Sequence, residues 1–378
     1  MEALPSMSSN AEHLMMKHTP LHVEHLKLGA QLVDYAGWAM PLRYESETSE
    51  HRAVRSAAGL FDLSHMGEIE VVGPQADRFL DYALVNSPSA IAPGRARYSM
   101  ICAEDGGVID DLVVYRIDTD RYMVVSNAAN APQVLLDLAD RSTGFEVSIQ
   151  DGLDDWALIA IQGPSSAAIV EALTCTTTTD LKYYAIRPDR IGSVDVRLAR
   201  TGYTGEDGFE VYCRADQATH VWEQALAIGT PMGMVPAGLA ARDSLRLESG
   251  MPLYGNELSA GMSPFDAGLG RVVDFDKAAP FVGRDALLQL RDSPSHRVLV
   301  GLRSSGRRPL RQGYDVTDSS GIVRGQITSG CVSPSLGFPI AMAYVDPSEA
   351  APDTQLTVPV RGSTEHVVVV PLPFYSRV

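Results

Sequence analysis

The feature that most constrains the fold is a pattern that occurs twice in the first part of the chain. Residues 69–84 read IEVVGPQADRFLDYAL and residues 157–173 read ALIAIQGPSSAAIVEAL. In each, an apolar run of strand type is followed by Gly-Pro and an amphipathic helical pattern. Pro74 and Pro164 are predicted to lie in the first turn of their helices, where proline is tolerated. The repeat predicts two related mixed α/β units.

Each copy is followed by a predicted hairpin with an acidic glycine turn and then by a helical pattern. The first hairpin is RYSMICAEDGGVIDDLVVYR and the second is VRLARTGYTGEDGFEVYC. The helical patterns are NAPQVLLDLAD and DQATHVWEQALAIG. From about residue 297 the chain changes to short β-rich runs broken by Gly, Pro and Ser, which predicts a small barrel or sandwich as a separate C-terminal domain.

Composition narrows the class of partner. The 31 Lys and Arg against 47 Asp and Glu give a formal charge of −16, which disfavours binding to nucleic acid or an anionic membrane. No apolar run reaches the roughly 18 to 20 residues that span a bilayer, and the opening stretch, residues 1–18, matches neither a secretory signal nor a transit peptide. The cysteines lack C-x-x-C spacing and the histidines lack ligand spacing. We expect a cytoplasmic protein with a frayed N-terminal tail, reduced thiols, no metal and a small-molecule or protein partner.

Residues 106–116, GGVIDDLVVYR, place two acids inside an apolar strand pattern. Strand alternation puts Asp111 on the same face as Tyr115 and puts Asp110 on the other face. Ionised carboxylates are costly in such positions unless they are paired or hydrogen-bonded. For Asp110, a bond to the backbone of the turn glycines is one explanation. Asp111 is predicted to face a cleft, where it can bind an amine-bearing ligand or accept a proton.

Three further segments carry candidate binding groups. The glycine spacing of residues 200–210, RTGYTGEDGFE, fits neither G-x-G-x-x-G nor a P-loop. Its Tyr203 and Glu210 can instead frame a planar heterocycle, by packing and by accepting N–H hydrogen bonds. Residues 237–258 begin as a helix whose charges form either a solvated face or, at an inward arginine, a carboxylate clamp. The arginines of residues 303–313 form the densest basic patch, which is either solvated or attracts an anionic group.

A series of motifs runs in order from about Thr19 to Tyr375: DYAGWAMPLRY, GLFDLSHMGEI, GGVIDDLVVYR, VVSNAAN, ARTGYTGEDGFEVY, GLAARDSLRLESGMPLYGNEL, ITSGCVSPSLGFPIAMAYVD and a terminal PFY. Together they resemble the T-protein family of the glycine cleavage system, which are folate-dependent aminomethyltransferases. One such motif is moderately specific, whereas the ordered set is strongly specific.

The resemblance implies an α+β fold of three domains, a cloverleaf around a central folate funnel. Residues 1–66 and 155–260 would form a discontinuous first α/β domain and residues 67–154 the second. Residues 261–378 would form a connecting segment and a C-terminal β-barrel-like domain. The implied enzyme transfers the methylene of an aminomethyl group, carried on the dihydrolipoyl arm of its partner H-protein, to tetrahydrofolate. It releases ammonia and forms 5,10-methylenetetrahydrofolate.

The resemblance also implies site residues. The second acid of IDD, Asp111, corresponds to the family's catalytic carboxylate, which can stabilise charge or accept a proton as a folate nitrogen attacks the methylene. Arg242 corresponds to an arginine near the glutamate end of folate, and Arg311 to another cavity or tail-binding position. The positions that line the folate cavity in the family correspond to Met66, Tyr98, Tyr115, Asn127, Tyr203 and Glu210.

One departure and several rival functions accompany the resemblance. Where many relatives carry Trp in GLxW, this chain has Arg271, which removes an aromatic contact and adds a cation near the expected cavity. A folate-dependent demethylase of a small methylated substrate would share the cavity without needing H-protein. A catalytically silent folate-binding module would share it without the reaction, and Asp111 disfavours that alternative. The tRNA-modifying relatives carry a cysteine near GMPLYGNEL, which this chain lacks.

Overall fold

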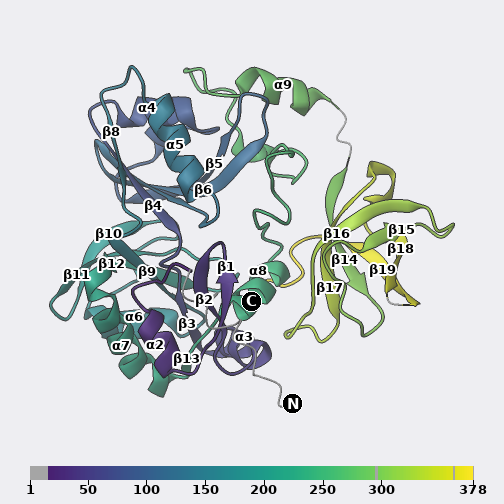
Figure 1. The fold of residues 1–378 in the computed structure, drawn as a ribbon, viewed down its shortest axis with the longest axis horizontal. Helices are drawn as coiled ribbons and strands as arrows, with labels where there is room; N and C mark the ends of the chain where they lie inside the picture. Colours follow the sequence, from purple (N-terminus) through teal and green to yellow (C-terminus); the bar gives the residue numbers. More distant parts are fainter. Residues whose placement is uncertain (1–15, 294–296, 361, 378) are drawn as a thin grey trace, which may run out of the picture.

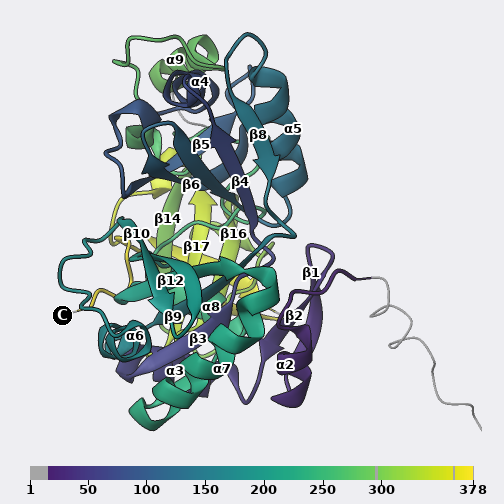
Figure 2. The ribbon, with the colours of Figure 1, turned by 90° about the vertical axis from the view of Figure 1, so that its left-hand side faces the viewer.

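The structure, a computed structural model, describes residues 16–293, 297–360 and 362–377 of the chain. Figures 1 and 2 show two sheet-and-helix units, one above the other, and a β-barrel beside them. The expected three-part α+β architecture is confirmed. Most of the expected N-terminal tail, residues 1–15, lies outside the described residues. None of the helices in the described ranges combines the length and the apolar character needed to cross a bilayer.

The first unit is built on a six-stranded sheet. Its strands, in spatial order, are β10 (Ile186–Ile191), β11 (Val194–Ala199), β12 (Gly208–Arg214), β9 (Trp156–Gln162), β3 (Ala58–Asp62) and β13 (Met234–Pro236). Period-2 alternation gives the sheet two apolar faces. One face packs against α6 (Ser166–Thr174) and α7 (Ala218–Gly229) through residues such as Ile159. The other packs against α3 (Glu47–Ser56) and α8 (Leu239–Glu248) through residues such as Ala160.

The second unit is built on a five-stranded antiparallel sheet. Its strands, in spatial order, are β5 (Arg95–Cys102), β6 (Val108–Asp118), β7 (Arg121–Ser126), β4 (Gly67–Val72) and β8 (Ser148–Asp151). On one face, Leu112 and Val114 join the core under α4 (Ala76–Ala83) and α5 (Ala131–Arg141). On the other face, Tyr115 and Val125 pack against Leu158 of the first sheet. The two sheets therefore face each other across a shared apolar layer.

The repeated sequence pattern forms matching structures, with one correction. Each copy folds as a strand followed by a helix, β4 with α4 and β9 with α6. Gly73 and Gly163 turn the chain with φ values of 149° and 132°, where a side chain would be strained. Pro74 and Pro164 do not lie in the first helical turn as predicted. Each proline lies two residues before its helix begins, because Gln75 and Ser165 occupy the N-cap positions of α4 and α6.

The C-terminal unit is a closed barrel, which decides between the barrel and the sandwich that the β-rich runs predicted. Its strands, in order around the barrel, are β14 (Val298–Ser304), β17 (Pro339–Val345), β16 (Val323–Val332), β15 (Asp315–Thr317), β18 (Gln355–Val360) and β19 (Ser363–Val370). The other regular elements of the described residues are α2 (His22–Lys27), β1 (Gln31–Tyr35), β2 (Trp38–Arg43), α9 (Arg284–Asp292) and the 3-10 turns η1 (Pro88–Ala90), η2 (Ala215–Gln217), η3 (Thr230–Met232), η4 (Gly270–Val272) and η5 (Pro347–Glu349). The four cysteines are free thiols, as expected.

Sheet membership suggests where the domains divide. Strands β3 and β4 are consecutive in the chain but belong to different sheets. Strands β8 and β9 are likewise consecutive and belong to different sheets. The barrel begins after the long connecting segment that follows α8. We therefore propose the division into 1–66 with 155–260, 67–154 and 261–378.

A buried carboxylate, Glu248 at the end of α8, attaches the barrel to the first unit. Its carboxylate accepts hydrogen bonds from the hydroxyls of Ser333 and Ser335 in the loop after β16. It also contacts Nε2 of His51 at 3.1 Å and the guanidinium of Arg55 at 2.9 Å. Burial alone would raise the pKa of this carboxyl, but these partners outweigh it and lower the pKa to about 2.

The lowered pKa of Glu248 predicts a pH-dependent contribution to stability. A carboxyl whose pKa is lower in the folded than in the unfolded chain, where it is about 4.3, stabilises the fold above pH about 4.3. That contribution is lost as the pH falls toward 2. We expect Glu248→Gln to flatten the decline in urea midpoint across this window. Glu104→Gln, at an exposed glutamate, is the control, and an unchanged decline in the Glu248 variant would contradict the prediction.

Candidate functional site

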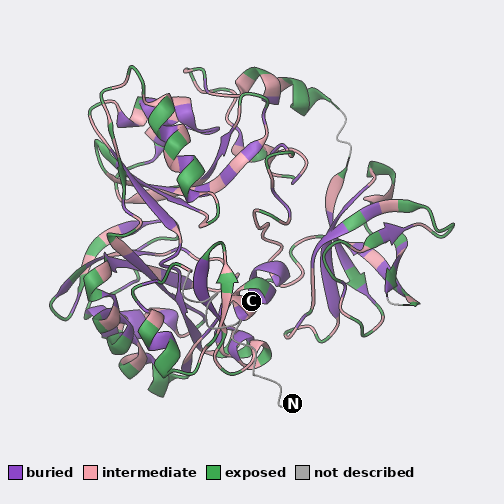
Figure 3. Cartoon of the chain, viewed as in Figure 1, coloured by how far each residue is buried: buried purple, intermediate pink, exposed green. Residues whose placement is uncertain are grey.

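A cavity of about 400 Å³ lies where the two sheets face each other. Its wall includes the β1–β2 turn, the β3–β4 loop, β5, β6, the segment leading into α5, the loop before β12, β12 itself, α8 and residues 252–256. Figure 3 shows that the strands facing it are largely buried or half-buried. The volume is within the roughly 300 to 1,000 Å³ of typical small-molecule sites.

The cavity brings together most of the predicted site residues from distant parts of the chain. Arg311, in contrast, is exposed on the barrel and is not on the cavity wall; its charge acts instead on Glu47. The chain's unusual Arg271 is also exposed in η4 and does not line the cavity, so the expected extra cation there is not found. The predicted residues on the wall are Met66, Tyr98, Asp111, Tyr115, Asn127, Tyr203, Glu210 and Arg242.

Asp111 faces the cavity from the middle of β6, on the strand face that alternation predicted. Its Oδ2 accepts a 2.9 Å hydrogen bond from the Tyr98 hydroxyl of the neighbouring strand. Its Oδ1 accepts a 2.9 Å hydrogen bond from the side-chain amide of Asn127. Burial raises the pKa of the Asp111 carboxyl, and these two hydrogen bonds partly oppose the effect. The group is thus held in one orientation and suited to exchanging a proton with a bound ligand.

Asp110 does not bond the turn glycines, which corrects the interpretation offered from the sequence. Its side chain is fully buried and accepts hydrogen bonds from Asn127 and Asn130, at the start of α5. The turn bond is made by Asp105, whose Oδ1 accepts from the Gly107 N–H at 3.0 Å. Sequence proximity suggested the turn, whereas the pairing of β6 with β7 brings residue 127 alongside Asp110.

Glu210 presents a second carboxylate to the cavity from β12. Its Oε2 accepts hydrogen bonds from three hydroxyls, those of Thr201 at 2.5 Å, Tyr115 at 3.1 Å and Tyr212 at 3.4 Å. Its Oε1 has no hydrogen-bond partner among the described residues. The carboxylate is therefore oriented by one oxygen and has the other available to accept N–H groups of a ligand.

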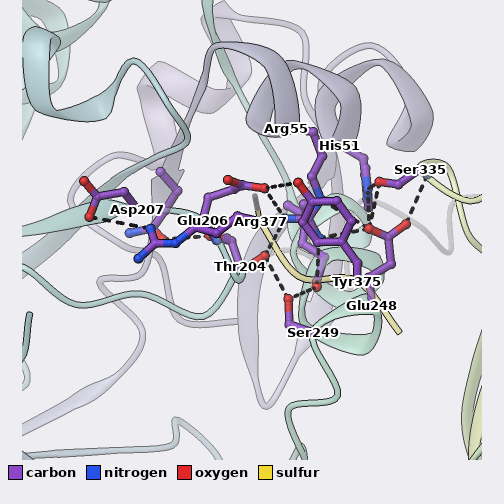
Figure 4. Close-up of polar contacts among 12 residues, drawn as sticks. His51, Arg55, Thr204, Glu206, Asp207, Glu248, Ser249, Ser335, Tyr375 and Arg377 are labelled. Carbon is purple, nitrogen blue, oxygen red and sulfur yellow. Dashed lines mark hydrogen bonds and ion pairs between the residues drawn. The ribbon is translucent and has the colours of Figure 1, made fainter. Parts of the chain in front are cut away.

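The loop that carries Tyr203, residues 200–207, is fixed by a polar cluster outside the cavity (Figure 4). Arg55 of α3 donates to the Thr204 carbonyl at 2.7 Å and pairs with Glu206 at 2.8 Å. The centre of the Tyr375 ring, near the C-terminus, lies 4.0 Å from the guanidinium carbon of Arg55. The hydroxyl of Tyr375 donates a hydrogen bond to the Glu206 carboxylate at 3.0 Å. The hydroxyl of Tyr203 itself donates to the Pro252 carbonyl. The cluster sets the position of one cavity wall.

Arg242 brings positive charge to the cavity from α8. Its guanidinium carbon lies 4.9 Å from the centre of the Tyr203 ring, and none of the ion pairs found among the described residues includes it. An arginine held in this way can bind a carboxylate of a ligand through two parallel hydrogen bonds. Of the two alternatives for this helix, Arg242 thus fits the inward arginine that lines the cavity.

Models of two known domains match successive parts of the chain without overlap. The GCVT N-terminal domain matches residues 21–277, and the glycine cleavage T-protein C-terminal barrel domain matches residues 297–376. The chain belongs to the glycine cleavage T-protein family. Its relatives are similar over nearly their whole length. The aminomethyltransferase of Streptomyces coelicolor is 54% identical over 96% of this chain and 98% of the relative. That of Bacillus subtilis is 40% identical over 96% and 100%.

A solved structure agrees with the T-protein family assignment. The glycine cleavage system aminomethyltransferase T from Bartonella henselae is 37% identical, has a TM-score of 0.89, and the match covers 95% of this chain and 98% of that one. An identity of 37% supports common family membership as well as a common fold. The family assignment therefore rests on sequence and structure together.

The structure adds residues to this T-protein family site that sequence reasoning missed. His65 precedes the predicted Met66 and is buried on the wall, where burial lowers the pKa of its imidazole to about 4, so it is neutral near pH 7. Its Nδ1 has no hydrogen-bond partner in the described part of the chain. The sequence signal for His65 was its position next to the predicted Met66. Tyr35, which also lies on the wall, belongs to DYAGWAMPLRY, a motif that carried the resemblance. The remaining polar additions were not singled out from the sequence, although all but Tyr184 lie in motifs that carried the resemblance: Tyr184, Thr201, Tyr212, Tyr254, Asn130 and Asn256.

Proposed function

We propose that the chain is an aminomethyltransferase that transfers the methylene of an aminomethyl group from the dihydrolipoyl arm of H-protein to tetrahydrofolate. The products are ammonia and 5,10-methylenetetrahydrofolate. Family membership over the whole chain supports the reaction class. The observation that carries the assignment is the Asp111 carboxyl, which is held by Tyr98 and Asn127 at the wall of a cavity that also contains Glu210 and Arg242.

The groups on the cavity wall fit the chemistry of tetrahydrofolate. Its pterin has adjacent N–H groups on a planar ring, which match the available Oε1 of Glu210. Its glutamate end carries carboxylates, which match the guanidinium of Arg242. Glu210 and Arg242 thus offer one charged group to each end of such a ligand. Neutral His65 and the tyrosines supply further polar and aromatic contact.

The proposed reaction requires proton transfer at a controlled position. The methylene carbon loses its bonds to the amine nitrogen and the lipoyl sulfur and gains bonds to two folate nitrogens. The two protons that these folate nitrogens lose balance those gained by the ammonia and the thiol. Asp111 is placed to stabilise developing positive charge and to exchange such protons. A partly enclosed cavity also keeps a reactive one-carbon unit from water.

Docking of H-protein would depend on local charge. The net charge of −16 gives the enzyme no general attraction for an acidic carrier. Arg303, Arg307, Arg308 and Arg311 are exposed on the barrel and form a local basic patch. We propose this patch as a contributor to carrier association, which salt should weaken.

Ammonia release from aminomethylated H-protein, measured with and without tetrahydrofolate, tests the function. An aminomethyltransferase is expected to release ammonia much faster when tetrahydrofolate is present and to form methylenetetrahydrofolate in equal amount. A demethylase of a small methylated substrate would ignore the H-protein substrate. A silent binding module would bind tetrahydrofolate without any release. Either of these two results would overturn the proposal.

Removal of the Arg242 guanidinium is expected to weaken folate binding more than it slows the saturated reaction. A charge-assisted hydrogen bond contributes about 1.5 to 3 kcal/mol, so Arg242→Ala should raise the Kd for tetrahydrofolate by about 10- to 100-fold. Titration calorimetry measures the affinity, and kcat at saturation measures the chemistry. Arg271→Ala, at an exposed arginine off the cavity wall, is the matched control. An unchanged Kd in the Arg242 variant would contradict the clamp.

A further inference from the structure

Asp110 is a buried acid directly beside the proposed catalytic carboxyl, and the mechanism above gives it no role. Its side chain is 0% exposed. Every hydrogen bond that it accepts comes from an N–H group. Oδ2 accepts from the Asn127 backbone at 2.9 Å, and Oδ1 accepts from the side-chain amides of Asn127 at 2.8 Å and Asn130 at 2.6 Å. Since N–H groups only donate, they stabilise the ionised form of this carboxyl.

Asn127 connects Asp110 to Asp111. Its Nδ2 lies 2.8 Å from Asp110 Oδ1, 2.9 Å from Asp111 Oδ1 and 3.0 Å from the Asp111 carbonyl. An amide nitrogen has two N–H donors, so this one group bridges the two side chains. Asp110 also holds the Asn127 backbone N–H, which fixes the residue whose amide orients Asp111.

The two acids differ in the hydrogen-bond partners of their carboxyl oxygens. Asp111 Oδ2 contacts the hydroxyl of Tyr98 at 2.9 Å, and a hydroxyl can accept a hydrogen bond as well as donate one. A proton on Asp111 Oδ2 therefore has an acceptor, whereas a proton on either oxygen of Asp110 would point at an N–H donor. The geometry favours Asp111 as the protonated member of the pair.

We propose that Asp110 and Asp111 form a coupled pair that holds one proton, in which ionised Asp110 is a positioning residue that keeps the proton on Asp111. Burial raises the pKa of both carboxyls, and the negative charge of Asp111 adds to the rise at Asp110. Two interacting acids titrate as a pair, so the hydrogen-bond partners of each oxygen are what assign the shared proton. The charge of the pair raises the pKa of four nearby hydroxyls: Tyr98 of β5, Tyr254 of the 252–256 segment, Tyr184 before β10 and Tyr203 of the loop before β12. The ionisable groups that share the cavity wall with Asp111 are Glu210, Arg242 and His65.

The role of the pair in catalysis rests on the proposed function. Protonated Asp111 gives its proton to the amine nitrogen of the aminomethyl group. The carbon–nitrogen bond then breaks with its electron pair on nitrogen, ammonia leaves, and a sulfur lone pair stabilises the carbon. A folate nitrogen attacks that carbon and releases its proton to the Asp111 carboxylate. The second folate nitrogen then displaces the lipoyl sulfur from the carbon, and its proton passes to the thiolate. The pair thus returns to its starting state with one proton.

The state of the pair is tested first in the ligand-free protein, which separates it from the proposed function. Carbon-13 NMR of protein labelled at the aspartate carboxyl carbons follows the titration, and Asp110→Asn and Asp111→Asn assign the two signals. In the wild-type protein we expect Asp111 to titrate above the ordinary aspartate pKa of about 3.9 and above Asp110. Asp110→Asn removes the like charge and should lower the Asp111 midpoint by about one pH unit or more.

A second variant keeps the test decisive if Asp110→Asn does not fold. Asn130→Ala removes one N–H donor from Asp110 without removing its charge, so the Asp110 midpoint should rise. The proposal is overturned if Asp110 carries the proton in the wild-type protein, or if neither variant shifts the midpoints in these directions. In kinetics, the alkaline limb of kcat should move to lower pH in Asp110→Asn, because Asp111 then loses its proton earlier. A lower kcat with an unmoved limb would indicate a structural role only.

Discussion

Replacing Asp111 with asparagine is expected to lower turnover of aminomethylated H-protein by on the order of 10²- to 10⁴-fold, the usual contribution of a positioned acid or base. Affinity for tetrahydrofolate should change by no more than about tenfold, or about 1.4 kcal/mol. Asparagine has the same shape, and its amide can still contact the Tyr98 hydroxyl and the Asn127 amide. The substitution therefore removes the exchangeable proton while the cavity wall is retained.

The matched control for this variant is Asp105→Asn, in the same hairpin. Asp105 is exposed at the turn and accepts from the Gly107 N–H through one oxygen, a bond that asparagine can also make. Single-turnover ammonia release measures the chemical step, and titration calorimetry measures binding. The control should match the wild-type protein in both. Wild-type turnover by the Asp111 variant would remove Asp111 from the mechanism.

Replacing Arg246 with methionine is expected to lower the free energy of unfolding by about 3 to 5 kcal/mol, the cost of breaking a buried ion pair. Arg246 of α8 is 0% exposed. It pairs with buried Glu257 at 2.8 Å, donates to Ser329 of β16 at 2.7 Å and contacts Asp243 at 2.7 Å. Without the guanidinium, Glu257 remains buried with its charge unpaired. The hydrogen bond from Arg246 of α8 to Ser329 of the barrel is lost as well.

A second substitution separates the unpaired charge from the lost packing. Arg246→Met combined with Glu257→Gln removes the orphaned charge and should recover part of the loss. Denaturant unfolding measures each variant. Arg190→Met is the control, because Arg190 pairs with Asp195 where both side chains are largely exposed, and it should leave stability nearly unchanged. Equal stability of the Arg246 variant and this control would show that the buried pair does not hold the barrel.

Local periodicity made much of the architecture predictable. The apolar patterns gave the repeated strand and helix units and the C-terminal barrel, because such patterns depend on residues that are near in sequence. Period-2 alternation also placed Asp111 and Tyr115 on one face of β6, and that face is the one that meets the cavity. The resemblance to the T-protein family supplied the reaction and eight of the residues that line the cavity.

The partners of the buried charges were not predictable in this way. Asp110 meets Asn127 because β6 turns back and pairs with β7. Arg246 meets Ser329 because the barrel docks on α8, although 83 residues separate them in the chain. Arg311, predicted for the cavity or the folate tail, lies on an exposed part of the barrel. The cavity wall is formed by segments that precede the barrel in the chain.

The sequence by itself determined the classes of structural unit, the face on which the key acid lies and the family to which the chain belongs. Each of these is encoded in short-range patterns or in ordered motifs. Only the tertiary structure decided that Asp110 and Asp111 share the amide of Asn127, that Glu210 is oriented through one oxygen, and that His65 lies on the wall. The physical reason is that a buried polar group must find its hydrogen-bond partners in space, and strand pairing and domain packing bring those partners from distant parts of the chain.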